Sequence, residues 1–235
     1  MSEGFDRQRL LWEIFRRLHR QFGPRGWWPA RTPFEVVVGA ILTQAVAWRN
    51  VEQAIANLEA AGLLSPPALW AAPAEELYPL LRPTRYFRAK TAKLKAFLEV
   101  LHREYGLELE RLFQEETAAL RERLLAIPGL GPETADAIVL YAAGQPSFVV
   151  DEYTRRIFHR LGETPERISY QRLQDYFTAV LPVDVTFWNE FHALIDGLGH
   201  SWCRADPRCD DCPLADLCPT AAAKGGNLLS GRAGN

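Results

Sequence analysis

Four cysteines near the C-terminus are the residues whose type and spacing most directly indicate chemistry. They lie within 16 residues and none precedes them, with gaps of five, two and five residues: Cys203, Cys209, Cys212 and Cys218. Extracellular scaffolds spread their cysteines to join distant segments, whereas a compact set of thiolates binds metal. Structural zinc usually takes two close pairs. One close pair between two longer gaps favours a [4Fe–4S] cluster, with zinc as the alternative.

A single aspartate follows a short apolar segment in the second half of the chain. Residues 148–150 read Phe-Val-Val, Asp151 comes next, and an Arg-rich amphipathic segment follows. An aspartate in this place is a good helix N-cap, and the local sequence by itself favours that role. The same carboxylate could also stabilise a cation, or position and deprotonate a water. Asp151 is therefore a candidate catalytic residue.

A glycine-containing turn lies twenty residues before this aspartate. Residues 128–131 read Pro-Gly-Leu-Gly between two predicted helices, the second beginning at Pro132. The two glycines allow a tight turn with N–H groups pointing outward, and the free N–H groups of a helix start suit a phosphate oxygen. An ordinary turn between helices is the alternative.

The order of these three features resembles the endonuclease III superfamily, the helix-hairpin-helix base-excision DNA glycosylases. The resemblance rests on residues 127–135, 149–151 and the four cysteines, and it runs from about residue 27 to 219. It implies an all-α fold of two helical domains flanking a DNA-binding groove, and a [4Fe–4S] cluster. It also implies that double-stranded DNA containing a damaged base is the partner, and that the base is flipped out of the duplex. In this scheme Asp151 is catalytic, and Gly129, Leu130 and Gly131 grip the DNA backbone.

One departure from the family decides the predicted chemistry. Members with lyase activity carry a lysine just after the hairpin, which forms a Schiff base with the sugar; the matching residue here is Glu133. The lysines nearest in sequence, Lys95 and Lys224, are far from the motif. We therefore expect a monofunctional glycosylase that leaves an abasic site, with weak or absent lyase activity. A glycosylase/lyase for oxidised pyrimidines and a non-catalytic iron–sulfur protein that binds DNA lesions are the alternatives.

Three tryptophans indicate the kind of base removed. The bacterial 3-methyladenine glycosylases of the endonuclease III type are the most similar branch, through Trp27-Trp28-Pro29, residues 41–44 and Glu133. An N-alkylated purine is positively charged and stacks well on electron-rich rings. Trp27, Trp28 and Trp48 are the predicted base pocket together with Glu133, and core packing is the alternative for each tryptophan. Gln44 is expected to fill the gap left in the DNA stack.

Basic residues gather locally in a chain whose net charge is −2, from 27 Lys and Arg against 29 Asp and Glu. Residues 82–95 contain six basic residues and no acid, and three arginines follow Asp151 closely. A charge run is usually a solvated helix face, but two runs favour phosphate contacts. From them we select Arg88, Lys90 and Arg155 as DNA-binding residues.

The periodicity of apolar residues predicts helices that position these groups. We expect helices over 6–21, 34–42, 46–58, 87–104, 117–126, 132–143, 151–161, 169–181 and 184–198, with short helices between prolines at 66–83. Residues 30–145 are the predicted helical barrel, with the hairpin at 125–143. Residues 1–29 and 146–220 are the predicted cluster domain, with its loop at 203–218, and 221–235 a disordered tail.

Composition and segment lengths bound the setting of the protein. An apolar content of 48% and seven tryptophans exclude a disordered chain. No apolar run approaches the roughly 20 residues that span a bilayer, and the N-terminal residues lack a signal-peptide pattern. We expect a monomer in the cytoplasm, associated with the nucleoid and without a membrane partner.

Overall fold

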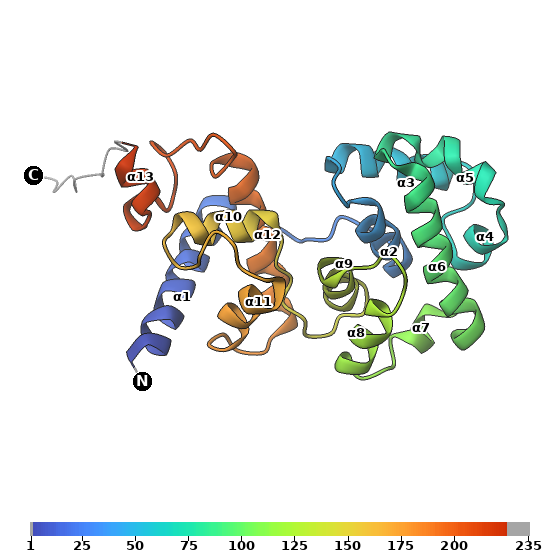
Figure 1. Ribbon diagram of the computed structural model, residues 1–235, viewed down its shortest axis with the longest axis horizontal. Helices are drawn as coiled ribbons and strands as arrows, with labels where there is room; N and C mark the ends of the chain where they lie inside the picture. Colours follow the sequence, from blue (N-terminus) through green and yellow to red (C-terminus); the bar gives the residue numbers. More distant parts are fainter. Residues whose placement is uncertain (1, 225–235) are drawn as a thin grey trace, which may run out of the picture. The chain divides into compact units, whose positions relative to one another are not determined.

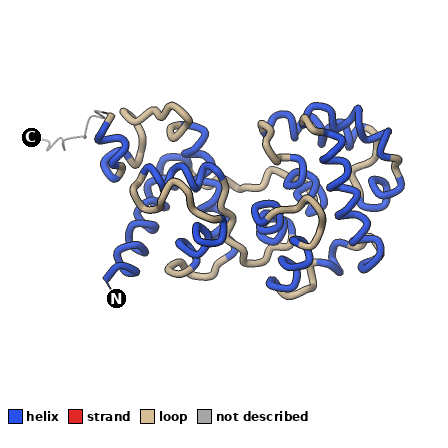
Figure 2. Tube along the Cα trace, viewed as in Figure 1, coloured by secondary structure: helices blue, strands red, loops and turns tan. Residues whose placement is uncertain are grey.

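A computed structural model describes residues 2–224, so most of the predicted tail lies outside the described residues. Between those bounds every regular element is helical, and no strand occurs, which confirms the all-α prediction (Figure 2). Residues 147–150 form no regular element and are buried, and Asp151 follows them. In the same part of the chain, no helix has the length and apolar character to cross a membrane.

Residue contacts divide the chain into two units. The first, here the terminal unit, comprises described residues 2–27 and 148–224, and the second, the central unit, comprises residues 28–147. The chain therefore begins in the terminal unit, folds the central unit as one continuous segment, and then returns. The assignment of these units as a cluster domain and a helical barrel stays a prediction.

The terminal unit is built around one long helix (Figure 1). Its elements are α1 (Ser2–Phe22), α10 (Glu152–Arg160), α11 (Tyr170–Thr178), α12 (Val185–Ser201), a 3-10 turn η3 (Ala215–Leu217) and α13 (Pro219–Ala223). Helix α12 packs against both α1 and α10, and the rings of Phe148 and Phe177 stack with centroids 4.5 Å apart in the core. Helix α13 corrects the tail prediction, because Ala221 is helical and buried.

The central unit surrounds a helix that is apolar on all sides after Glu35 in its first turn. Its elements are α2 (Pro33–Leu42), α3 (Trp48–Ala60), α4 (Pro66–Ala71), α5 (Ala74–Leu81), η1 (Arg82–Thr84), α6 (Phe87–Tyr105), α7 (Leu109–Leu112), α8 (Thr117–Leu125), α9 (Pro132–Ala137) and η2 (Ile138–Ala142). Helix α2 packs against α3, α6, α9 and η2. Since it has no polar face, it must be enclosed. Thr32 starts it by accepting a hydrogen bond from the N–H of Glu35 at 3.1 Å.

Two local details differ from the predicted helices. The helix expected over 132–143 is α-helical only to Ala137 and continues as the π-helical turn η2, a feature found frequently at functional sites. Between α2 and α3, Ala45 has a φ of 54°, which costs energy for a residue with a Cβ.

Candidate functional site

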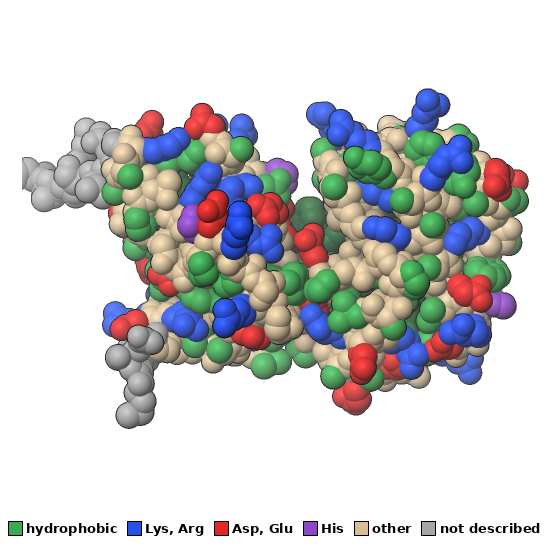
Figure 3. Space-filling model, in the orientation of Figure 1, with side chains coloured by type: hydrophobic (Ala, Val, Ile, Leu, Met, Phe, Trp, Pro, Cys, Tyr) green, Lys and Arg blue, Asp and Glu red, His purple; other side chains and the backbone are tan. Residues whose placement is uncertain are grey.

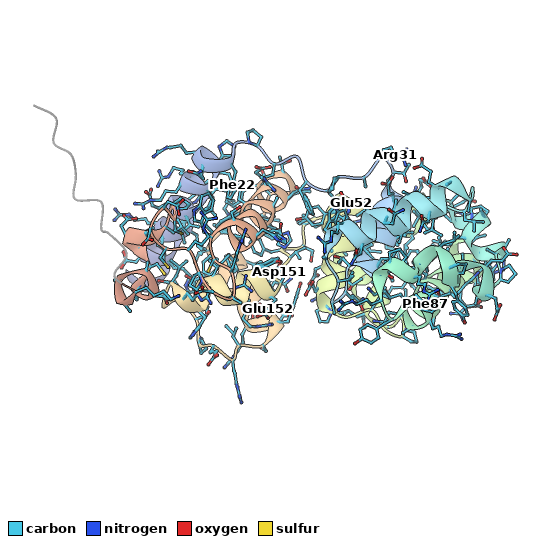
Figure 4. The ribbon with its side chains drawn as sticks, turned by 90° about the horizontal axis from the view of Figure 1, so that it is seen from above. Phe22, Arg31, Glu52, Phe87, Asp151 and Glu152 are labelled. Atoms are coloured by element: carbon cyan, nitrogen blue, oxygen red, sulfur yellow. The ribbon has the colours of Figure 1, made fainter. Side chains whose placement is uncertain are left out.

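Asp151 begins α10, and one of its carboxylate oxygens forms the N-cap. Oδ1 accepts hydrogen bonds from the backbone N–H and the hydroxyl of Thr154, each at 2.7 Å. The side chain is 15% exposed, and it lies beside the exposed Glu152 at the helix start (Figure 4). The capping role expected from local sequence is therefore real, and it leaves the second oxygen for another partner.

That partner is a histidine that the sequence did not indicate. His192 Nε2, from α12, lies 3.7 Å from Asp151 Oδ2, and its side chain is 9% exposed. Burial would raise the pKa of Asp151, but the nearby charge of His192 and the hydrogen bonds from Thr154 lower it below its ordinary value. The carboxylate is thus ionised although it is largely buried, as a group that stabilises a cation must be.

The hairpin in the central unit uses its two glycines differently. Gly129 has a φ of 90°, and a Cβ there would lie 2.7 Å from Cγ of Lys93. Gly131 has a φ of −96°, which any residue adopts, and a Cβ there would meet nothing within 4 Å. The turn therefore requires glycine at 129 only, and at 131 the missing side chain leaves the backbone accessible.

The side chain of Leu130 is buried, and its part in DNA binding by the hairpin stays a prediction. Its side chain is 6% exposed and belongs to the core, and its N–H donates to the carbonyl of Ile127 at 3.1 Å. Leucine occurs here because the turn must be anchored in the apolar interior. The backbone at the flanking glycines is the part of the hairpin that faces outward.

A buried ion pair holds the two hairpin helices together. Asp136 on α9 is fully buried and accepts two hydrogen bonds from Arg121 on α8, at 2.6 and 3.1 Å. The hydroxyl of Ser147 donates to the same carboxylate at 2.5 Å. This pair was not predicted, because each residue looks like an ordinary charged residue on a helix.

Gln44 and Lys93 lie against the hairpin. The Gln44 side-chain amide donates to the hydroxyl of Thr134 at 3.0 Å, and the ammonium group of Lys93 donates to Gln44 Oε1. The carbon chain of Lys93 lies across Gly129. Although Lys93 is far from the hairpin in sequence, its side chain reaches the hairpin from α6.

Two of the three predicted pocket tryptophans come together, and a tyrosine joins them. The ring centroids of Trp28 and Trp48 are 5.2 Å apart at an interplanar angle of 84°, and those of Trp28 and Tyr141 are 5.3 Å apart. All three side chains are half-buried. Tyr141 was missed; it comes from the π-helical turn. Trp27 belongs to the terminal unit, and its place beside this cluster stays a prediction, as does a pocket role for the exposed Glu133.

Comparisons with known proteins decide the family. Residues 38–182 match the HhH-GPD superfamily of base excision DNA repair proteins. The chain is also 40% identical over 210 residues to MJ1434 of Methanocaldococcus jannaschii, named as a DNA repair glycosylase, covering 89% of this chain and 96% of the relative. The chain belongs to the HhH-GPD superfamily. It is a DNA repair glycosylase of that superfamily.

Solved structures confirm the endonuclease III fold of this HhH-GPD protein. It is similar to endonuclease III in a non-covalent complex with DNA, with a TM-score of 0.80 and 23% identity, covering 93% of this chain and 98% of that one. It is also similar to the H. pylori 3-methyladenine DNA glycosylase MagIII bound to 1,N6-ethenoadenine. That match has a TM-score of 0.72 and 24% identity, covering 83% of this chain and 97% of the other.

The structure corrects one DNA-binding residue predicted for this HhH-GPD protein. Lys90 is only 3% exposed, and its ammonium donates to the carbonyls of Leu42 and Thr84 at 2.7 and 2.6 Å. Burial, with a smaller effect of the Lys93 charge, lowers its pKa to about 8. Lys90 joins α6 to the end of α2 and cannot contact a phosphate.

The other basic candidates lie at the surface. Arg88 is exposed with its guanidinium 4.7 Å from the centre of the Tyr78 ring, while Arg155 pairs with Glu152 at 2.9 Å. Charged side chains of both signs gather on the face over α10 (Figure 3).

Tyr86 was missed as a candidate. It is 75% exposed and, like Arg85 before it, has a positive φ, so a strained turn presents an aromatic ring among arginines.

The four cysteines are free thiols in the terminal unit, each half-buried. Arg160 links two of them, because its guanidinium donates to Cys203 Sγ at 3.3 Å and its carbonyl accepts from Cys218 Sγ at 3.2 Å. Burial, followed by the charges of the other three cysteines, raises the pKa of Cys212 to about 11. Across residues 2–224, no three Cys, His, Asp or Glu side chains are arranged to hold a metal ion.

Proposed function

We propose that this glycosylase hydrolyses the N-glycosidic bond of a flipped N-alkylated purine, such as 3-methyladenine, in double-stranded DNA, and that it leaves an abasic site without cutting the strand. The observation that carries the proposal is the carboxylate of Asp151, which is largely buried, has a lowered pKa and is held at the start of α10. It acts as a monomer on chromosomal DNA in the cytoplasm.

Asp151 supplies the chemistry through its charge. As the bond between base and sugar breaks, positive charge develops on the sugar, and a fixed carboxylate in a poorly solvated site stabilises that charge strongly. The same carboxylate orients the attacking water and accepts its proton. Because Oδ1 is committed to Thr154, Oδ2 is the oxygen that accepts the proton.

The aromatic cluster supports the choice of substrate class. A ring of Trp28, Trp48 or Tyr141 attracts a cationic base more than a neutral one of the same shape. An alkylated purine is also a good leaving group because it already carries the charge that protonation would supply. Such a base needs no strong general acid in the protein.

The hairpin and its neighbours support DNA binding by the central unit. The accessible backbone at Gly131, together with Lys93 and Gln44 beside Gly129, suits a phosphate oxygen and the nucleotide next to it. The chain is acidic overall, so these contacts and the surface arginines supply the attraction to DNA.

We propose a [4Fe–4S] cluster on Cys203, Cys209, Cys212 and Cys218. The donor chemistry fits, because four free thiols influence one another electrostatically around Arg160. A zinc site would need the four sulfurs in one tetrahedral shell, whereas a four-iron cluster takes one thiolate at each iron and so accepts sulfurs farther apart. When bound, the cluster would cross-link the loop 203–218 through its four thiolates, and the hydrogen bonds of Arg160 with Cys203 and Cys218 connect that loop to α10.

Lys93 favours a second candidate function, the glycosylase/lyase for oxidised pyrimidines. That activity needs an amine near the hairpin in place of a lysine at Glu133, and Lys93 lies there. We rank it second because the ammonium of Lys93 is committed to Gln44.

The test combines base release with covalent trapping. Asp151→Asn should lose base release from a methylated duplex by about a hundredfold or more while keeping DNA binding; unchanged release would overturn the assignment. Borohydride should trap no protein–DNA adduct with the wild-type protein. An adduct that disappears in Lys93→Ala would establish the second candidate. A panel of duplexes carrying single lesions identifies the base.

A further inference from the structure

Helix α12 carries three titratable residues at successive turns. His192, Asp196 and His200 are spaced by four, so they share one face of the helix. His192 Nε2 lies 3.7 Å from Asp151 Oδ2, and His200 Nε2 lies 3.6 Å from Asp196 Oδ1. Two histidines of one helix therefore each face a carboxylate, but their side chains are 9% and 58% exposed respectively.

The two oxygens of Asp151 have different partners. Oδ1 is held by two hydrogen bonds from Thr154, which set the position of the carboxyl group along α10. Oδ2 faces the buried imidazole of His192. Rotation of the carboxylate is therefore limited from both sides, and the group that reacts is placed by two helices, α10 and α12.

His192 also lies between two carboxylates. The charge of Asp151 raises the cost of ionising Asp196, while the charge of His192 stabilises the ionised form of both carboxylates. Burial, followed by this competition, raises the pKa of Asp196 above its usual value. Without His192, a largely buried Asp151 would face a second acid with no compensating charge from α12.

The other titratable or charged groups around His192 and Asp151 come from three segments. On α12 they are Asp196 and His200, and on α10 they are Tyr153 and Arg156. Arg25, after α1, contributes a positive charge near Asp196. The ring of Tyr153 lies against Gly199, where a Cβ would approach within 2.5 Å, and its hydroxyl is 3.4 Å from His200 Nδ1. Of these groups, His192 is the histidine that faces the reacting carboxylate.

We propose that His192 is a positioning residue that keeps Asp151 ionised and its Oδ2 oriented, and so sets the acid limit of base excision. The inference rests on the proposed catalytic role of Asp151. His192 acts through the carboxylate and touches neither base nor sugar.

The test compares two histidines of the same helix. His192→Gln removes the imidazole beside Asp151, and His200→Gln removes the exposed imidazole beside Asp196. Single-turnover base release should fall in acid for His192→Gln, with its acid limb moved upward by at least about one pH unit, which is a loss of roughly tenfold on that limb. At mildly basic pH, where Asp151 is ionised in all three proteins, His200→Gln should match the wild type, and the loss that remains in His192→Gln measures the orientation of Oδ2. An unmoved acid limb in folded His192→Gln would overturn the inference.

A second variant and a direct titration keep the inference testable if His192→Gln does not fold. His192→Asn, a second change at the same position, should move the acid limb upward in the same way. Asp196→Asn should leave the limb unmoved, because Asp196 has the raised pKa and is already neutral where Asp151 titrates. Carboxyl NMR of aspartate-labelled protein, assigned with Asp151→Asn, should show a raised Asp151 pKa in the His192 variants without any activity measurement; an unchanged Asp151 pKa in a folded His192 variant would contradict the role. Full activity of Asp151→Asn defeats the proposed function itself, whereas inactive Asp151→Asn with unmoved His192→Gln defeats only this inference.

Discussion

The two glycines of the hairpin have different roles. Gly129 is required by its backbone conformation and by the Lys93 chain across it, whereas Gly131 meets neither constraint. Because no contact within the protein requires glycine at 131, the absent side chain leaves space for another molecule to reach the backbone. For a DNA repair glycosylase, that is the DNA backbone.

Alanine at the two positions should therefore have opposite effects. Gly129→Ala should lower the free energy of unfolding by about 1–2 kcal/mol, because a Cβ is strained at that φ. Gly131→Ala should change it by less than about 0.5 kcal/mol but weaken duplex binding. Urea denaturation and DNA titration measure the two quantities. Equal stability losses would show that both glycines serve the turn alone.

Lys90 gives a second prediction, on pH. Its pKa is about 8 in the folded protein, against an ordinary 10.5, so between these values the unfolded chain binds more protons at this residue. Stability should therefore rise with pH across this window from the Lys90 contribution. The wild type should gain stability there relative to Lys90→Met, as measured by denaturation at each pH. Parallel curves would mean that Lys90 is not buried in solution, and DNA affinity should be similar in both proteins.

The scale of elements concerns how helices are fixed to one another. The buried pair Arg121–Asp136 joins α8 to α9, and Lys93 and Gln44 bring α6 and the end of α2 to the same turn. The hairpin is thus held by charged and polar contacts on one side and by Leu130 in the core on the other. These contacts make the turn a rigid platform.

Breaking the buried pair Arg121–Asp136 should destabilise the protein at the hairpin. Arg121→Ala leaves the fully buried Asp136 without its cation and should cost roughly 3–5 kcal/mol of unfolding free energy. The matched control is Arg111→Ala, because the Arg111–Glu108 pair is 60% exposed on both sides and should contribute less than about 1 kcal/mol. Chemical denaturation compares them. Similar small losses would contradict the structural role of the pair.

Lys93 should be the lysine of α6 that contributes to DNA binding. Lys93→Ala removes one cation beside the hairpin, so the slope of log affinity against log salt should fall by about one. Lys224→Ala is the control, since that exposed lysine pairs with Asp206 in the terminal unit. Titrations at several salt concentrations decide the matter, and an unchanged slope in Lys93→Ala would remove it from the DNA-binding surface.

At the scale of the whole molecule, the chemistry is divided between two separately packed units. Asp151, His192 and the cysteines belong to the terminal unit, and the hairpin and the aromatic cluster belong to the central unit. The terminal unit is made from both ends of the chain because the central unit is one continuous segment between them.

The cysteine loop is testable on the intact protein. Protein purified without oxygen should contain about four iron and four sulfide per chain and show visible absorbance that bleaches on reduction. Cys212→Ser removes one of the four proposed ligands and should lose iron and lower the melting temperature. Zinc in stoichiometric amount and a colourless protein would refute the cluster. Removal of iron should leave the hairpin unaffected, because it lies in the other unit.

Local features of the fold could be predicted from the sequence because they depend on neighbours a few residues away. Apolar spacing predicted most helices, and Asp151 followed by Thr154 was readable as a cap. The change from α to π geometry at η2 was not readable, since it depends on packing around Ile138–Ala142. Lys90 was wrongly predicted to bind DNA, because a lysine within a run of basic residues is usually exposed to solvent.

What the sequence determined by itself was the helical class, the superfamily and the residue types available for chemistry: a carboxylate at a helix start, a glycine turn, tryptophans and four thiols. The tertiary structure alone decided which of them have partners. It brought His192 to Asp151 across 41 positions, Lys93 to Gly129 across 36, and Tyr141 to Trp28 across 113. Helix propensity and capping act within one turn of the chain, whereas these pairs depend on how whole helices pack.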